Sequence, residues 1–155
     1  MSAVLESVPA HFEPMTEARL DEVMAIEQQA YEHPWSRGNF VDSLHAGYHG
    51  LLACSQDQVV GYLVAMEGVE EVHLLNIAVA PGRQGQGWAL LLLEALTLWA
   101  RARRAQWLWL EVRRSNLRAQ RIYERYGFRH VGERRNYYPA RHGQREDAIV
   151  MSLAL

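Results

Sequence analysis

Lysine is absent from this 155-residue chain, so all 16 of its basic residues are arginines. A Walker-type phosphate loop is therefore excluded, because that loop uses a lysine to reach the phosphates. The single cysteine, Cys54, excludes an internal disulfide and a thiolate zinc cluster, and its apolar neighbours predict a buried structural thiol. A helix that spans a membrane needs about 20 apolar residues in a row, and no apolar run here approaches that length. The first residues also do not resemble a signal peptide. We therefore expect a cytoplasmic protein that does not associate with membranes.

What the chain does contain is typical of a globular protein, with 49% hydrophobic and 22% charged residues. Its length suits one domain spanning residues 1–155. The charge is uneven, because residues 1–78 carry 12 acidic residues and two arginines, whereas residues 79–155 carry six and 14. A basic half suits an anionic ligand, and an acidic half suits a cationic one.

The order of the predicted elements is that of an α/β protein. The strand, helix and strand predicted over 72–113 imply a parallel pair, since such a crossover joins parallel strands. The other strands follow one another closely, so the sheet should be mixed and mostly antiparallel. We expect strands at 8–14, 48–55, 59–67, 72–79, 106–113, 128–137 and 145–154, and helices after Thr16, after Ser36, over 87–104 and from Ser115 to Gly127.

The helix predicted over 87–104 follows three closely spaced glycines. Its polar positions Glu94, Thr97 and Arg101 predict a narrow solvent-facing stripe, with burial of leucines such as Leu91. The N–H groups of its first turn have no partner within the helix and lie at the positive end of the helix dipole. The start of this helix is therefore a ready site for phosphate.

The glycine loop allows two interpretations. A dinucleotide-binding loop has the pattern G-x-G-x-x-G, but Leu90 stands at the third glycine position, and too few strand–helix repeats remain for a Rossmann domain. The alternative is Gln84-x-x-Gly87-x-Ala89, which resembles the Q/R-x-x-G-x-G/A loop of the GNAT acyltransferase superfamily. That resemblance implies the GNAT fold, with helices on both faces of the sheet, and acetyl-CoA as co-substrate. The residues implied to hold it are Ile77, Ala78, Val79, Gln84, Gly85, Gln86, Gly87, Trp88, Ala89, Leu90 and Asn116.

Acetyl transfer to an amine needs a proton acceptor, because an α-ammonium group has a pKa of about 8 and only the neutral nitrogen attacks. The residues alone leave open whether Glu111 is that acceptor or an ion-pair partner of a nearby arginine such as Arg113. Tyr123 lies on the apolar stripe of its predicted helix, where a tyrosine can simply be part of the core. The resemblance implies that Glu111 accepts the proton and that Tyr123 donates one to the departing thiolate.

Segments outside the glycine loop point to one group of enzymes within the superfamily. Residues 30–36, 135–139 and 145–148 are similar to the ribosomal-protein-alanine N-acetyltransferases (RimI type). This similarity implies transfer to the N-terminal α-amino group of a protein, the N-terminal alanine of a small-subunit ribosomal protein. Trp35, Tyr137 and Tyr138 would then line the acceptor groove, although the residues alone leave core packing equally open.

Other functions and ligands remain open from the sequence. The same fold can acetylate other protein N-termini, lysine side chains or small-molecule amines, and the arginines also permit a non-catalytic RNA-binding module. We expect no metal, because His45 and His49 lie beside helix-weakening glycines and no third ligand stands nearby. We also expect a monomer that does not bind nucleic acid directly.

Overall fold

The structure, a computed structural model, describes residues 10–155. Within that range, the helices and strands follow the order that the sequence predicts. Residues 8 and 9 of the first predicted strand lie outside the described residues. The strands are β1 (Ala10–Pro14), β2 (His49–Ser55), β3 (Gln58–Glu67), β4 (Glu71–Val79), β5 (Trp107–Arg113), β6 (Arg129–Pro139) and β7 (Arg145–Ala154). The α-helices are α1 (Leu20–Ala30), α2 (Arg37–His45), α3 (Trp88–Ala102) and α4 (Leu117–Tyr126).

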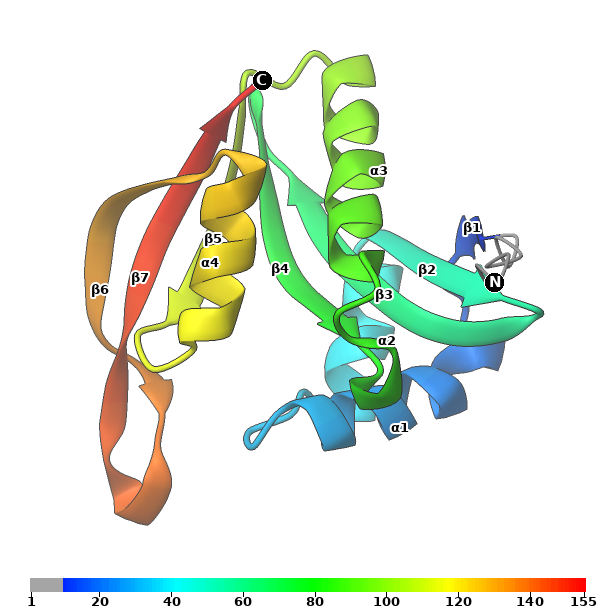
Figure 1. The fold of residues 1–155 in the computed structure, drawn as a ribbon, viewed down its shortest axis with the longest axis horizontal. Coiled ribbons are helices and arrows are strands. Elements are labelled where there is room, and N and C mark those ends of the chain that lie inside the picture. The colour runs from blue at the N-terminus through cyan, green and yellow to red at the C-terminus, as the bar shows by residue number, and fades with distance from the viewer. Residues whose placement is uncertain (1–9) are drawn as a thin grey trace, which may run out of the picture.

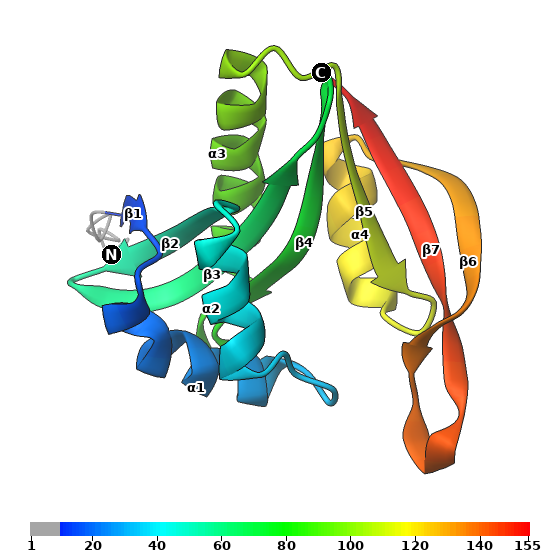
Figure 2. The same ribbon diagram turned by 180° about the vertical axis from the view of Figure 1, so that it is seen from behind.

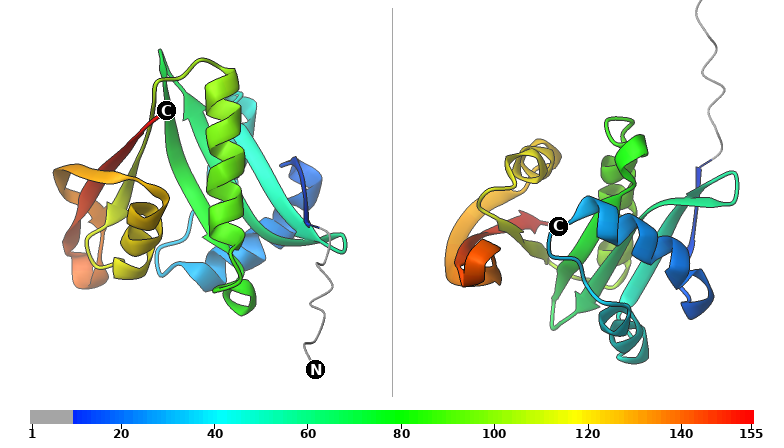
Figure 3. Two further views of the ribbon diagram at one scale, coloured as in Figure 1. Left: turned by 45° about the horizontal axis from the view of Figure 1, so that its top comes forward. Right: turned by 90° about the horizontal axis from the view of Figure 1, so that it is seen from below.

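The strands form one sheet in the order β1-β2-β3-β4-β5-β7-β6. Only the β4–β5 pair is parallel, and every other neighbouring pair is antiparallel. Helices α1 and α2 cover one face of the sheet, and α3 and α4 cover the other, as Figures 2 and 3 show. The predicted α/β class, with its central parallel pair and helices on both faces, is confirmed.

Strands β4 and β5 diverge partway along their length. Their register pairs only Glu71–Leu74 with Trp107–Leu110. Beyond these residues β4 continues beside β3 and β5 continues beside β7, so a wedge opens between them (Figure 1). The wedge opens toward the first turns of α3 and α4 (Figure 1). The glycine loop before α3 and the start of α4 therefore lie near each other at its open end.

The solvent-facing stripe predicted for α3 is wrong at two positions. Thr97 is only 2% exposed, whereas Leu91 is 45% exposed. The reason is the packing of α4 against α3, which places the Tyr126 hydroxyl 2.8 Å from Thr97 Oγ1 and 2.9 Å from Glu94 Oε2. A hydrogen-bonded polar side chain can therefore be buried at this helix contact, and an adjacent leucine is left at the surface.

The residues at which three helices are predicted to begin, Thr16, Ser36 and Ser115, differ in whether their side chains cap the helix. Ser36 caps α2 by accepting a backbone N–H three residues on. The segment after Thr16 begins with a 3-10 turn, and the Thr16 side chain makes no capping hydrogen bond. Asn116, rather than Ser115, caps α4. None of the helices described within residues 10–155 is long and apolar enough to cross a membrane.

Candidate active site

The glycine loop joins β4 to α3 and lies at the open end of the wedge between β4 and β5. Gly85 and Gly87 have φ angles of 79° and 92°, in the left-handed region that only glycine adopts without strain. Gly87 is the N-cap residue of α3, and no side chain of the described residues caps this helix. The first N–H groups of α3 are therefore available to an external acceptor, as an anion-binding helix start requires.

A groove of about 680 Å³ lies beside this loop, within the roughly 300–1,000 Å³ that is usual for small-molecule sites. Its described lining holds four arginines and no carboxylate, so it favours an anionic ligand. The arginines are Arg83, Arg118, Arg121 and Arg125. Ten of the eleven residues predicted to hold the co-substrate also line it: Ile77, Ala78, Val79, Gln84, Gly85, Gly87, Trp88, Ala89, Leu90 and Asn116.

Gln86 is the predicted loop residue that the structure does not place in the groove lining. Its Oε1 accepts a hydrogen bond of 3.1 Å from the indole N–H of Trp88. This bond links the loop to the first residue of α3. The position of Gln86 thus suits support of the loop more than contact with a ligand in the groove.

The β4 side of the groove has main-chain carbonyls that bond to side chains. The carbonyl of Ile77 accepts from the Tyr31 hydroxyl, and that of Val79 accepts from Gln84 Nε2 at 3.3 Å. Burial raises the pKa of Tyr31 well above its usual value, so its hydroxyl keeps the proton that it donates. Tyr31 is not predicted from the sequence, where its only signal is its place between the end of α1 and the Pro34-Trp35 segment.

A second pocket adjoins the groove and contains Glu111. The two cavities share Tyr31, Ile77, Asn116 and Tyr123, so the groove and the pocket meet at these residues. Among the polar and aromatic residues that line the pocket are Glu27, Tyr31, His33, Trp35, Asn76, Glu111, Arg113, Asn116, Tyr123 and Tyr138.

The structure brings two of the three predicted acceptor-groove residues into this pocket. Trp35 and Tyr138 line it, but Tyr137 does not. The ring of Tyr137 is 42% exposed and contacts that of Tyr138 edge to face, with centroids 4.9 Å apart. Tyr137 is therefore placed to support Tyr138 from outside the pocket.

Glu111 lies on β5 immediately after the last residue that pairs with β4. Its side chain is 5% exposed, and Oε2 lies 2.5 Å from Nε2 of His73. The other oxygen, Oε1, is buried and makes no aligned hydrogen bond within the described chain, although Nε of Arg134 is 3.1 Å away. Oε2 is thus held by His73, whereas Oε1 is paired with Arg134 and accepts no aligned hydrogen bond within the described chain.

Tyr123 lies on α4 and lines both cavities. It is 8% exposed, and its ring packs against Phe128 with centroids 5.7 Å apart. Burial raises the pKa of Tyr123 well above its usual value of about 10. The hydroxyl therefore stays protonated at neutral pH and can donate a proton where groove and pocket meet.

Asn116 also lies at that meeting point, between the two cavities. Its Oδ1 accepts the N–H of Ala119 at 3.1 Å, which caps α4. The two N–H donors of its amide remain for a ligand. Capping and ligand binding are therefore compatible roles for this side chain.

Glu27 is a buried carboxylate that the sequence analysis missed. It is 1% exposed and accepts hydrogen bonds from the Tyr62 hydroxyl at 2.6 Å and the Asn76 amide at 2.9 Å. Its second oxygen accepts the backbone N–H of Trp35, also at 2.9 Å. Glu27 therefore fixes the segment between α1 and α2, and with it the wall of the pocket.

We expect Glu27→Ala to lower the free energy of unfolding by about 3 kcal/mol, because it leaves two buried donors and one partly buried donor without an acceptor. Urea unfolding followed by circular dichroism measures the change. Glu124→Ala, which removes an exposed carboxylate on α4, is the control and should change stability by less than about 0.5 kcal/mol. Equal stability of Glu27→Ala and the unaltered protein would contradict the structural role.

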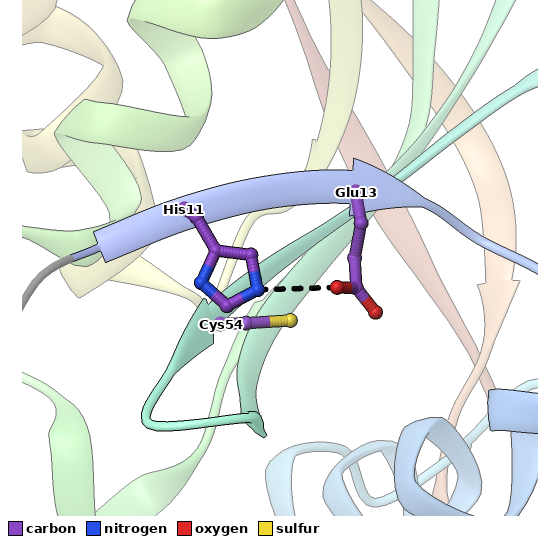
Figure 4. Close-up of side chains that lie close together, drawn as sticks. All are labelled: His11, Glu13 and Cys54. Carbon is purple, nitrogen blue, oxygen red and sulfur yellow. Dashed lines mark hydrogen bonds and ion pairs between the residues drawn. The ribbon is translucent and has the colours of Figure 1, made fainter.

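A separate group of possible metal ligands lies at the β1–β2 edge. His11 Nε2, the carboxylate of Glu13 and Cys54 Sγ lie within 4.8 Å of one another (Figure 4). Arg19 pairs with the same carboxylate, and burial raises the pKa of the Cys54 thiol. A cation would have to compete with the guanidinium and deprotonate a thiol that resists ionisation. Ion pairing explains this group better than metal binding does.

Known proteins are similar to this chain over most of its length. The Acetyltransferase (GNAT) family matches residues 20–128, which include α1, the diverging strands, the glycine loop and α4. The ribosomal protein bS18-alanine N-acetyltransferase of Haemophilus ducreyi is 39% identical over 143 residues, which cover 92% of this chain and 99% of that one. The Escherichia coli protein of the same name is 39% identical over 130 residues, covering 84% and 87% of the two chains.

Solved structures agree with this assignment. The crystal structure of the ribosomal-protein-S18-alanine N-acetyltransferase from Escherichia coli matches with a TM-score of 0.86 and 36% identity, over 94% of each chain. Ard1 from Thermoplasma volcanium matches with a TM-score of 0.84 at 21% identity, which shows a common fold. The chain belongs to the GNAT acetyltransferase family, whose members use acetyl-CoA as co-substrate.

Proposed function

We propose that this protein transfers the acetyl group of acetyl-CoA to the N-terminal α-amino group of a protein, namely the N-terminal alanine of a small-subunit ribosomal protein. The observation that carries the proposal is the meeting of an arginine-lined groove with a pocket that contains the buried carboxylate of Glu111. The names of the relatives in Haemophilus ducreyi and Escherichia coli support the choice of acceptor.

In this proposal the groove holds the anionic co-substrate. Its pyrophosphate lies at the free N–H groups of α3, between Gln84 and Leu90, with the lining arginines nearby. The pantetheine arm extends along Ile77, Ala78 and Val79 in the wedge, and the amide of Asn116 donates to it. The thioester then lies where groove and pocket meet, beside Tyr123.

The chemistry is a direct transfer. Oε1 of Glu111 takes a proton from the α-ammonium group, directly or through a water molecule, and frees the nitrogen lone pair. The nitrogen attacks the thioester carbonyl carbon, and a backbone N–H near Val79 stabilises the oxyanion. As the carbon–sulfur bond breaks, the Tyr123 hydroxyl gives its proton to the departing thiolate. The second proton of the attacking nitrogen then leaves to give the neutral amide and restores the Tyr123 hydroxyl, directly or through water, and the proton on Glu111 returns to solvent. The steps use no metal and no covalent enzyme intermediate.

The pocket suits a narrow, extended acceptor such as a chain terminus. Trp35 and Tyr138 supply aromatic walls, and Glu111 supplies a carboxylate beside Arg113, while the oxygens of Glu27 are already held by donors of the protein. Glu70 and Glu71, two carboxylates of the acidic half of the chain, are not among the residues that line the pocket. A ribosomal protein as acceptor places the reaction in the cytoplasm, and binding of its free terminus requires no contact with RNA.

The proposed function is tested with three acceptors of similar size and acetyl-CoA as donor. These are a peptide with N-terminal alanine and no lysine, an N-blocked peptide that contains lysine, and a small primary amine. We expect mass spectrometry to find one acetyl group on the α-nitrogen of the first peptide alone. Acetylation of only the lysine peptide or the small amine would overturn the acceptor assignment. Transfer to none, with strongly salt-dependent RNA binding, would favour a binding module.

A further inference from the structure

The side chain of His73 connects the parallel strand pair to Glu111. Across the β4–β5 register His73 lies opposite Trp109, and the two rings stack with centroids 3.7 Å apart and an angle of 10°. The His73 side chain is 12% exposed, and its Nε2 lies 2.5 Å from Oε2 of Glu111. We propose that His73 is a positioning residue for acetyl transfer, which holds Oε2 of Glu111 and leaves Oε1 to accept the proton. This inference rests on the proposed function.

The end of the strand pairing explains why Glu111 needs such a contact. Leu74 and Leu110 form the last residue pair of the parallel register, so Glu111 has no residue of β4 directly opposite it. Its carboxylate must be oriented by side chains. The stack on Trp109 fixes the plane of the His73 ring and so directs Nε2 at the carboxylate. An N–H donated from Nε2 to an ionised carboxylate is a strong, oriented hydrogen bond.

Arg134 is the other charged neighbour of Glu111, and its geometry is less suited to orient the carboxylate. Its side chain is 48% exposed, and its Nε approaches Oε1 at 3.1 Å without an aligned hydrogen bond. The guanidinium also lies 5.5 Å from the ring centroid of Tyr137. Arg134 thus places a positive charge at the rim of the pocket, whereas His73 orients the Glu111 carboxylate from within the sheet.

The test compares His73→Phe with His73→Gln. Phenylalanine keeps an aromatic ring to stack on Trp109 but has no nitrogen, whereas the glutamine amide can place an N–H donor near the position of Nε2. With saturating acetyl-CoA and the preferred acceptor, we expect kcat to fall about 10-fold or more for His73→Phe and to recover to within about 3-fold for His73→Gln. The KM for acetyl-CoA should stay unchanged in both variants.

His49 provides a matched control. It stacks on Trp99 with centroids 4.1 Å apart and an angle of 3°, outside the groove and the pocket. His49→Phe makes the same chemical change in the same stacked setting and should leave kcat unchanged. An equal loss of kcat in His49→Phe and His73→Phe, or no loss in His73→Phe, would overturn the proposal.

A double-mutant cycle separates positioning from general support of the fold. If His73 acts through Glu111, then His73→Phe should cause no further loss of kcat in the Glu111→Gln background. A full additional 10-fold loss there would contradict the proposal. The cycle can be run with whichever amine the protein acetylates, so a wrong acceptor assignment leaves its result meaningful.

An NMR measurement decides the contact even if no amine is acetylated and the proposed function fails. With nitrogen-15 in the histidine rings, the His73 signals are assigned by their loss in His73→Phe. We expect the Nε2 signal to be that of a protonated, hydrogen-bonded nitrogen and to shift in Glu111→Gln. Ring signals of His73 that are identical in the two proteins would overturn the proposed contact.

Discussion

Replacing Glu111 by glutamine is expected to lower kcat by roughly 10²- to 10⁴-fold, the usual contribution of a general base. Glutamine keeps the length of the side chain and an oxygen for His73, but it cannot take up a proton at neutral pH. Both the fold and the KM for acetyl-CoA should be retained, because Glu111 lines the acceptor pocket and not the groove. Steady-state rates of thiol release at saturating acetyl-CoA measure the effect.

The pH dependence of Glu111→Gln should show what the carboxylate does. Without a proton acceptor the variant depends on acceptor that is already neutral in solution, and this fraction grows until the pH passes the α-amino pKa of about 8. Between pH 6 and about 8, the rate of the variant should therefore increase by roughly the same factor as the fraction of acceptor amine that is neutral. Glu133→Gln removes a carboxylate that pairs with Arg114 at 3.0 Å, outside the pocket, and should leave the rate unchanged. A kcat within about 3-fold of the unaltered enzyme would exclude Glu111 as the proton acceptor.

Tyr123→Phe is expected to lower kcat by about 10²-fold or more, because the thiolate must then leave without a proton donor. The ring and its contact with Phe128 remain, so thermal stability and the KM for acetyl-CoA should change little. Burial raises the pKa of Tyr123, so the hydroxyl stays protonated over the working range of pH. The loss should therefore be the same factor at each pH between about 6 and 9.

Tyr126→Phe is the matched control for this second prediction. Tyr126 lies on the same helix, and its hydroxyl contacts Thr97 and Glu94 outside both cavities. Its loss should reduce stability by about 1 kcal/mol and leave kcat unchanged. A near-normal kcat for Tyr123→Phe, or a loss as large for Tyr126→Phe, would contradict a specific proton donor at Tyr123.

The parts of this protein that the sequence predicts well depend on local patterns. The glycine spacing predicts the loop, and Gly85 and Gly87 do adopt the left-handed backbone. The strand, helix and strand order likewise predicts the parallel pair on which the wedge depends. Glu111 and Tyr123 follow from a motif resemblance, and the structure places both of them in the lining of one pocket.

The parts that the sequence does not predict depend on contacts between distant segments. A role for His73 cannot be predicted from the sequence, because its contact with Glu111 depends on the register of two strands separated by a helix. Glu27 looks like a polar residue on α1 until β3 and β4 bury it. Tyr137 and Tyr138 are hard to assign because the register of β6 shifts just before Tyr138 and Asn136 has a positive φ. Simple alternation therefore fails to say which ring faces the pocket.

The wedge also has a consequence for the solubility of the fold. Between residues 75 and 79, β4 pairs with β3 on one side, and on the other side it has no paired strand among the described residues. A free edge of this kind normally invites a strand of another molecule and so promotes aggregation. Here the free edge lies in the middle of the sheet and lines the groove beside α3 and α4, so a strand of another molecule would have to pass these helices to pair with it. The fold thereby leaves this unpaired sheet edge open to a small ligand, and we expect the flanking helices to hinder its pairing with another copy of the protein.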